Sequence, residues 1–333
     1  MSIYTSQFLN TKFGFSLLDI YYEIVRTRRY GTSSSATNIP KVPVTTMKYL
    51  IVLLFGAVCI HENNALFGIK CPRKSLKAKY SLAPWAGYYD IPKTSDDDLM
   101  ADYVQIDEET AKLDVPGTMW CRPEDPRVCL IMDTKGQNVG MQISFLDQDT
   151  EGVVGYDYSA VNTYTRTNIF NVSANSMRVY FTNPKNLTSE GRAASDETVD
   201  GVWTTLKGEL VELPKTDPKV TRSGNFYRQS CFPQMGQHYF YDMYDNMTDC
   251  SQHVPFFGIY HNGENVGFGI ANYGKASTAE NGRDWYETVP LLGVKMIMPH
   301  RPQCVDDLVT KNGLYSLHVY FVEFPYLIGC LFQ

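Results

Sequence analysis

One turn motif occurs twice in this 333-residue chain. Residues 136–143 read G-Q-N-V-G-M-Q-I, and residues 263–270 read G-E-N-V-G-F-G-I. An apolar run precedes each copy, at residues 128–132 and 255–260. Glycine at such a point supplies the positive φ of a tight turn, so each copy predicts a β-hairpin.

A looser match joins residues 176–181 (S-M-R-V-Y-F) to residues 293–298 (G-V-K-M-I-M), with the basic residue at the same place. Together the two matches predict related β-rich halves, at residues 66–220 and 221–333. The alternative is that two unrelated hairpins use the same turn.

The rest of the chain after residue 65 also has the composition of strands. Runs rich in Val, Tyr, Phe, Thr and Ile alternate with Gly, Pro and Asn clusters. The predicted strands are residues 153–158, 162–170, 199–213, 285–298 and 314–323. Residues 96–113 have apolar spacing that suits a helix, although part of this stretch alternates like a strand. We therefore expect a mainly β, disulfide-bonded fold with an antiparallel sandwich or barrel-like architecture.

Residues 47–65 have the layout of a secretory signal peptide. Lys48 follows Met47, an apolar core runs over residues 49–60, and a polar stretch ends at Ala65. This core is shorter than the ~20 apolar residues of a membrane-spanning helix. We expect the mature chain to begin near Leu66 and to be secreted, without a stable membrane span.

Residues 1–46 precede this signal, and a signal normally opens a chain. We expect translation to start at Met47, which makes residues 1–46 a disordered extension outside the mature protein. The alternative is a signal anchor with Arg26, Arg28 and Arg29 on its cytoplasmic side.

Cysteines and glycosylation sequons agree with secretion. Three N-x-[ST] sequons occur, at Asn171, Asn186 and Asn246, which predicts a glycoprotein. In an oxidising compartment most cysteines pair. Proximity favours the pairs Cys121 with Cys129, Cys231 with Cys250, and Cys304 with Cys330. Cys71 is left over, either free or bonded to a partner chain.

The formal net charge is −6, and it becomes about −9 without residues 1–65, which hold six basic and three acidic residues. An acidic surface disfavours nucleic acid and anionic membranes as partners. Instead, we expect an extracellular small molecule, lipid or glycan.

Motifs for catalysis are missing, since the sequence contains no G-x-S-x-G, H-E-x-x-H, P-loop or strand-borne GxGxxG. Asp147, Asp149 and Glu151 alternate before a glycine, as a calcium loop begins, but the pattern stays incomplete. A plain acidic turn is the alternative, and we expect no other cofactor.

Residues 237–245 gather aromatic and polar side chains. Tyrosines give large, rigid contact surfaces, so a weak ligand site is predicted here. Its members are His238, Tyr239, Tyr241 and Tyr244, with His261 from the second hairpin. The alternative is a strand with half of its rings in the core.

Our leading hypothesis is a secreted glycoprotein that binds an extracellular ligand without catalysis. A second is a secreted hydrolase with a dispersed site, in which His238, His261 or His318 acts as acid or base next to a carboxylate. A third is a structural component of the extracellular matrix.

Overall fold

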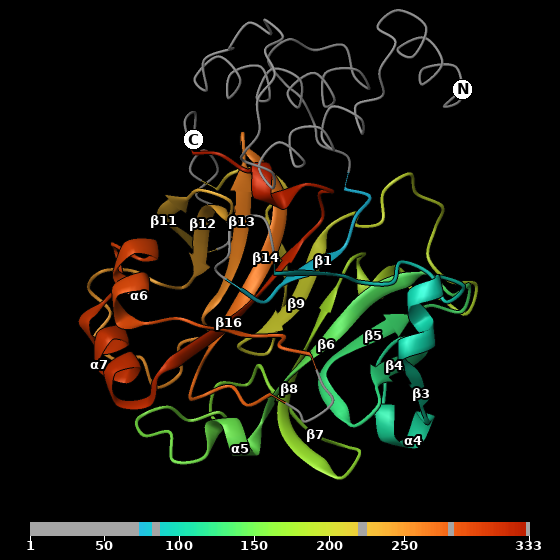
Figure 1. The fold of residues 1–333 in the computed structure, drawn as a ribbon, viewed down its shortest axis with the longest axis horizontal. Coiled ribbons are helices and arrows are strands. Elements are labelled where there is room, and N and C mark those ends of the chain that lie inside the picture. Colours follow the sequence, from blue (N-terminus) through green and yellow to red (C-terminus); the bar gives the residue numbers. More distant parts are fainter. Residues whose placement is uncertain (1–72, 82–86, 219–224, 279–282, 331–333) are drawn as a thin grey trace, which may run out of the picture. The chain divides into compact units, whose positions relative to one another are not determined.

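The computed structural model describes residues 73–81, 87–218, 225–278 and 283–330. They belong to one compact unit, Asn63–Gln333. The predicted signal at 47–65, the predicted extension at 1–46 and Cys71 lie outside the described residues. The mainly β, antiparallel fold is confirmed: two sheets of eight strands form a sandwich-like arrangement, and neither sheet closes into a barrel (Figure 1).

We call the first sheet, which lies between residues 104 and 213, sheet I. Its strands run in the order β3-β4-β5-β6-β8-β9-β10, and β7 pairs with β8. The bounds are β3 (Val104–Ile106), β4 (Thr118–Arg122), β5 (Asp125–Met132), β6 (Asn138–Leu146), β7 (Thr165–Ile169), β8 (Val172–Tyr180), β9 (Val202–Leu206) and β10 (Glu209–Leu213).

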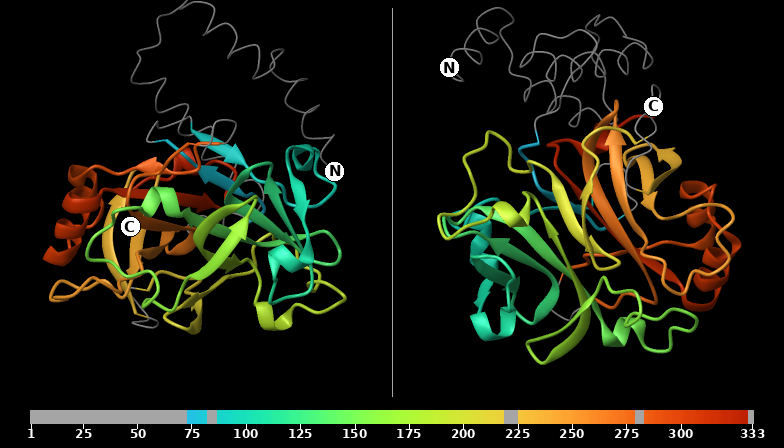
Figure 2. Two further views of the ribbon diagram at one scale, coloured as in Figure 1. Left: turned by 90° about the horizontal axis from the view of Figure 1, so that it is seen from below. Right: turned by 180° about the vertical axis from the view of Figure 1, so that it is seen from behind.

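Sheet II takes strands from both ends of the described chain. Its order is β11-β12-β13-β14-β16-β1-β2, and β15 pairs with β16. The bounds are β1 (Lys77–Lys79), β2 (Tyr88–Asp90), β11 (Phe226–Phe232), β12 (Gly236–Tyr241), β13 (Phe256–His261), β14 (Glu264–Tyr273), β15 (Glu287–Thr288) and β16 (Leu314–Tyr320). The green strands of sheet I and the orange to red strands of sheet II stay on separate sides in both views of Figure 2.

The two sheets have the same topology. Read along the chain, β1 to β8 and β9 to β16 are two runs of eight strands with equivalent pairing partners. The first hairpin of each run is exchanged: β1 and β2 complete sheet II beside β16, whereas β9 and β10 complete sheet I beside β8. Each repeat therefore contributes one hairpin to the sheet of the other.

The sequence carries this repeat in a hexapeptide. Residues 176–181 read S-M-R-V-Y-F, and residues 316–321 read S-L-H-V-Y-F. Tyr180 pairs with Gly140, and Tyr320 pairs with Gly267, so the hexapeptides hold equivalent positions. The predicted match of 176–181 to 293–298 is wrong, because the latter residues lie in and just after a helix.

Both predicted hairpins are present, as β5-β6 and β13-β14. The turn glycines Gly136 and Gly263 have φ of 75° and 80°, as the turns require. Within the strands that follow, Gly140 of β6 lies against β8, and Gly267 of β14 lies against β16. An added Cβ would stand 2.6 Å from the Val179 carbonyl oxygen in one case and 2.4 Å from that of Val319 in the other.

A second short sequence repeat lies at the end of each exchanged hairpin. Residues 91–94 read I-P-K-T after β2, and residues 213–216 read L-P-K-T at the end of β10. The Lys93 carbonyl accepts a hydrogen bond from the Asn138 amide at 2.8 Å, and the Lys215 carbonyl accepts one from Asn265 at 2.9 Å. Both hairpins are thus tied to the turn of their own repeat.

The inner faces of the sheets share one apolar core. Alternate residues of β5, β6 and β8 point into it from sheet I, and alternate residues of β14 and β16 point into it from sheet II. Phe145 of β6 packs edge to face on Tyr315 of β16, with ring centroids 6.0 Å apart.

Three predicted elements differ from the structure. Residues 285–298 form only the short strand β15, after which Pro290 precedes α6 (Leu291–Ile297), whose Val294 is buried. The predicted helix at 96–113 is divided into η1 (Asp98–Asp102), β3 and α4 (Glu108–Ala111). Residues 153–158 form no strand. The remaining elements are α5 (Asp147–Thr150), η2 (Pro184–Asn186), α7 (Gln303–Asn312) and η3 (Pro325–Leu327).

Three disulfides link the described cysteines. Cys121 on β4 bonds to Cys129 on β5, as predicted. The other two predicted pairs are wrong: Cys231 bonds to Cys330, and Cys250 bonds to Cys304. The C-terminal segment passes beside β11, where the Gln234 amide donates to the Ile328 carbonyl. Spatial neighbours along this path, rather than sequence neighbours, determine the pairing.

Candidate functional site

A surface pocket of about 380 Å³ opens where β15 meets the end of β1. Its described lining is Tyr80, Ser81, Ala276, Ser277, Thr278, Asp284, Trp285, Tyr286, Glu287 and Thr288. We call it the Glu287 pocket. Its size lies at the lower end of the range of small-molecule sites, roughly 300–1,000 Å³.

The carboxylate of Glu287 is the most unusual group in this lining. The residue is only 4% exposed, and neither carboxylate oxygen accepts a hydrogen bond. Oε1 lies 2.7 Å from Nδ1 of His318, a distance typical of an ion pair, but the geometry is not that of a hydrogen bond. Burying a carboxylate without hydrogen-bond donors is costly, and the adjacent His318 is placed to offset part of this cost.

Further polar groups gather on the same face of sheet II. Lys79 pairs with His318 in the β1-β16 register, and its ammonium group lies 4.9 Å from the centre of the Tyr88 ring. Burial lowers the pKa of Lys79, although the nearby Glu287 charge acts to raise it. Burial also raises the pKa of Tyr88 to about 12.

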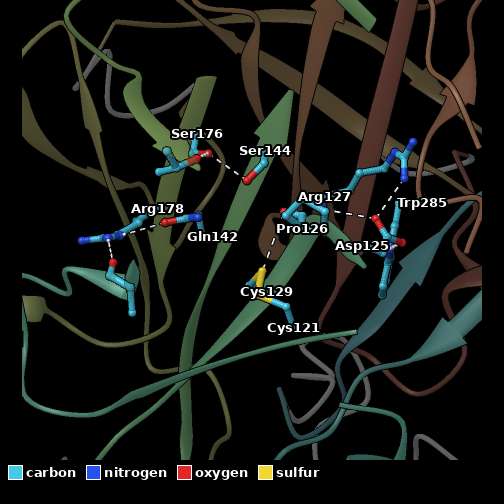
Figure 3. Close-up of a disulfide and its surroundings, with 12 residues drawn as sticks. Cys121, Asp125, Pro126, Arg127, Cys129, Gln142, Ser144, Ser176, Arg178 and Trp285 are labelled. Atoms are coloured by element: carbon cyan, nitrogen blue, oxygen red, sulfur yellow. Dashed lines mark hydrogen bonds and ion pairs between the residues drawn. A yellow bond between two sulfur atoms is a disulfide. The ribbon is translucent and has the colours of Figure 1, made fainter. Parts of the chain in front are cut away.

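A buried charged network supports the other side of the pocket. Arg127, 1% exposed, donates to Asp125 at 3.0 Å and to the Ser277 hydroxyl at 2.8 Å. The indole N–H of Trp285 donates to Asp125 at 3.0 Å (Figure 3). Asp149 accepts the Ser277 amide at 2.8 Å, and burial raises the pKa of Asp149.

This network spans both sheets, since Asp125 and Arg127 belong to β5 of sheet I, whereas Ser277 and Trp285 precede β15 of sheet II. It therefore fixes two lining residues of the Glu287 pocket against the opposite sheet. Each buried charge is paired, as burial demands.

A second pocket, of about 540 Å³, occupies the equivalent place on sheet I. Thr165 pairs with Ser176 in sheet I, and Glu287 pairs with Ser316 in sheet II. Thr165 and Glu287 therefore hold equivalent positions, and each lines the pocket of its own sheet. The hexapeptide repeat places Arg178 where sheet II has His318. The described lining is Glu109, Thr110, Ala111, Lys112, Thr165, Arg166, Thr167, Asn168, Ser173 and Arg178.

The aromatic residues predicted to form one ligand site do not lie together in the structure. Tyr239 and Tyr241 are buried and pack on Tyr260 and Phe226, respectively. Tyr244 is exposed, 37%, beside Tyr227. His261 is half-buried at the end of β13.

His238 is fully buried on β12, and its ring centroid lies 5.9 Å from that of His318. Its Nδ1 lies 3.3 Å from the Ser230 carbonyl, while Nε2 has no hydrogen-bond partner. Burial lowers the pKa of His238 to about 3. It belongs to the polar cluster behind the Glu287 pocket rather than to a surface formed with its tyrosine neighbours.

The three carboxylates proposed for calcium face different partners. Asp147 forms a two-fold ion pair with the exposed Arg166, which lowers the pKa of Asp147. Asp149 points into the network with Ser277. Glu151 is exposed after α5. Across the described ranges, no group of three or more His, Cys, Asp or Glu residues is placed to hold a metal ion.

The three predicted glycosylation sites are all exposed. Asn171 lies in the turn between β7 and β8, Asn186 ends η2, and Asn246 lies in the loop after β12. Each asparagine is therefore accessible to a modifying enzyme. No helix in the described ranges is both long and apolar enough to cross a membrane.

Sequence reasoning named His318 as an acid or base candidate but missed Glu287 and Lys79. The structure brings His318 next to a carboxylate, as the hydrolase hypothesis requires. A serine is also near, because Ser316 lies opposite Glu287 in the strand register. However, the Ser316 hydroxyl has no hydrogen-bond partner, so neither His318 nor Glu287 activates it in this geometry.

No protein-family model matches this chain, and neither a curated protein nor a solved structure is similar enough to indicate a relative. The function must therefore be argued from the site alone.

Proposed function

We propose that this protein is a secreted binding protein that holds a small polar molecule in the Glu287 pocket and does not change it chemically. One observation carries this proposal: the pocket has the size of a ligand site, and most of its described lining residues have side chains with hydrogen-bonding groups. A polar ligand that forms hydrogen bonds with these side chains would bind more favourably than an apolar ligand of the same size.

The compartment is proposed from three further features. The described chain holds three disulfides, which persist in oxidising environments. Its three sequons are exposed, and the layout of residues 47–65 is that of a signal peptide. All three features fit a glycoprotein that is secreted before it meets its ligand.

The polar lining also narrows the three ligand classes expected from the sequence. Hydroxyl or carboxylate groups occur on Tyr80, Ser81, Ser277, Thr278, Asp284, Tyr286, Glu287 and Thr288. A lipid chain would leave these groups without partners, so a polar small molecule or a sugar fits the pocket better.

The test is a thermal-shift screen of polar small molecules on protein purified from culture medium. Asp284→Asn keeps the shape of an exposed lining side chain and removes its charge. Glu109→Gln makes the same kind of change in the pocket of sheet I and serves as the matched control. We expect at least one compound to raise the melting temperature of the wild type and of Glu109→Gln, but not of Asp284→Asn. Binding that is unaffected by Asp284→Asn would contradict the proposal.

A hydrolase is the second candidate, favoured by the 2.7 Å approach of His318 to Glu287. The two functions differ in the fate of the ligand. A binding protein releases the compound unchanged, as mass spectrometry after prolonged incubation would show. Conversion that is lost in His318→Asn would instead establish the enzyme.

A further inference from the structure

We propose that Asn262 is a site of spontaneous deamidation, at which the folded protein converts this asparagine to aspartate and isoaspartate without an enzyme. Asn262 and Gly263 form the two-residue turn between β13, which ends at His261, and β14, which begins at Glu264. Their φ angles are 50° and 80°. Neither residue belongs to the described lining of the Glu287 pocket, so this site is independent of the function proposed above.

The reaction needs only the two turn residues and water. The backbone nitrogen of Gly263 gives up its proton and bonds to Cγ of Asn262, and the bond between Cγ and Nδ2 breaks. The Nδ2 nitrogen takes up the proton and leaves as ammonia, which leaves a five-membered succinimide ring. Water then opens the ring at either of its carbonyls, so the products are aspartate and isoaspartate. Asparagine is accordingly one of the thermolabile residues of proteins.

The attacking nitrogen is available in this turn. The Gly263 carbonyl accepts the Asp217 amide at 2.9 Å, but the Gly263 N–H donates to no group among the described residues. A Cβ built at Gly263 would have no atom within 4 Å apart from its chain neighbours, so nothing crowds this side of the turn. Glycine also lacks a side chain of its own that would hinder ring closure.

The attacked carbon belongs to a side chain that can rotate. Asn262 is exposed, and exposed side chains change rotamer within nanoseconds. Its Nδ2 atom lies 3.3 Å from Nε2 of His261, so this contact involves the nitrogen that leaves and not the carbon that is attacked. Rotation of the side chain and of the turn peptide is then all that brings Cγ to the Gly263 nitrogen.

The same dipeptide occurs at Asn312–Gly313, where the structure opposes each step. Asn312 is only 8% exposed, and its amide group is held at both ends by Val154: Oδ1 accepts the amide at 2.9 Å, and Nδ2 donates to the carbonyl at 3.0 Å. The Gly313 amide donates to the Val309 carbonyl at 2.8 Å. Deamidation of Asn312 must therefore wait for local unfolding, whereas deamidation of Asn262 does not.

Conversion changes both the charge and the length of the turn. Either product adds a carboxylate next to Glu264 in a chain whose formal net charge is already −6. Isoaspartate also adds one carbon to the backbone, between the paired residues His261 and Glu264. A two-residue turn fixes the register of its hairpin, so this insertion should strain it. We expect the isoaspartate form to unfold at a lower urea concentration than the intact protein.

Peptide mapping by mass spectrometry, during incubation of the purified protein in mildly alkaline buffer, tests the inference. Digestion in acid stops the reaction, and conversion replaces an amide NH₂ by OH in the peptide mass. In the folded protein we expect Asn262 to convert about tenfold faster than Asn312 or more, because opening of the buried site costs free energy. In concentrated urea, where both dipeptides are exposed, the two rates should become similar. Residues 281–282, a third Asn-Gly, lie outside the described residues and do not enter the comparison.

Asn262→Gln is the matched control variant. It keeps an exposed amide but would have to close a six-membered ring, which forms much more slowly. The wild type should lose stability to urea as isoaspartate accumulates at position 262, and Asn262→Gln should lose less over the same time. Conversion of Asn262 no faster than that of Asn312 in the folded protein would overturn the inference.

Discussion

The rings of Phe181 and Phe321 pack edge to face, with centroids 6.2 Å apart and ring planes at 70°. Each residue ends the same hexapeptide in its own repeat. Each backbone N–H donates to the carbonyl of an equivalent valine, Val139 at 2.8 Å or Val266 at 2.9 Å. Two positions related by the repeat are thus in direct contact between the two sheets.

This contact predicts energetic coupling between the repeats. Phe181→Leu and Phe321→Leu should each lower the free energy of unfolding by roughly 1 kcal/mol. The loss of unfolding free energy in the double variant should differ from the sum of the two single losses by about 0.5–1.5 kcal/mol, as expected for an aromatic pair. Urea denaturation of the four proteins measures this coupling. Phe226→Leu combined with Phe181→Leu is the additive control, since Phe226 packs on Tyr241. Additivity of Phe181 with Phe321 would show that the contact is not formed.

The equivalent glycines Gly140 and Gly267 predict matched losses. An alanine methyl group would meet a carbonyl oxygen at 2.6 Å or 2.4 Å, so each backbone must shift. We expect Gly140→Ala and Gly267→Ala each to reduce the free energy of unfolding by about 1–3 kcal/mol. Gly293→Ala is the control, because its nearest neighbour would stand at an ordinary 3.4 Å. A loss at only one of the two equivalent glycines would argue against the structural repeat.

Disulfide pairing can be checked directly. Peptide mapping without reduction should yield the links 121–129, 231–330 and 250–304. Replacing Cys250 and Cys304 together by serine should cost about 2–4 kcal/mol, the usual contribution of a disulfide that closes a loop of this length. Recovery of Cys231 linked to Cys250 would contradict the path of the C-terminal segment.

The buried His238 predicts sensitivity to acid. Burial lowers its pKa to about 3, against about 6.5 in an unfolded chain. Below pH 6.5 the unfolded state therefore binds a proton that the folded state does not. The contribution of His238 to the free energy of unfolding is complete above about pH 6.5. It is lost as the pH falls toward 3, and the loss reaches roughly 2 kcal/mol at pH 5. Urea denaturation at pH 7 and pH 5 should show a smaller difference in His238→Phe than in the wild type. An identical difference would place His238 in contact with water.

The sequence predicted the hairpins because their information is local. A glycine between two apolar runs specifies a turn by itself, and Gly136 and Gly263 have the required φ. The exchange of hairpins could not be found in this way, because it depends on pairing between strands as distant as β1 and β16. The hexapeptide at 316–321 is a sequence signal of the repeat, whereas the weaker resemblance of residues 293–298 to 176–181 is misleading. Pro290, followed by the spacing of Leu291, Val294 and Met298, indicates the helix that lies there.

The site was harder to predict than the fold. A strand alternates its faces, so the aromatic run from His238 to Tyr244 could not form one surface, and its tyrosines pack elsewhere. Glu287 lies in a strand of two residues and reaches His318 only through the sheet. No spacing in the sequence marks this pair. A carboxylate that accepts no hydrogen bond becomes recognisable only when its surroundings are known.

The most direct test of the central claim is a crystal structure of the secreted protein with the small molecule that raises its melting temperature most. The account predicts density in the Glu287 pocket, with the ligand within hydrogen-bond distance of Asp284. A ligand bound on another surface would contradict it.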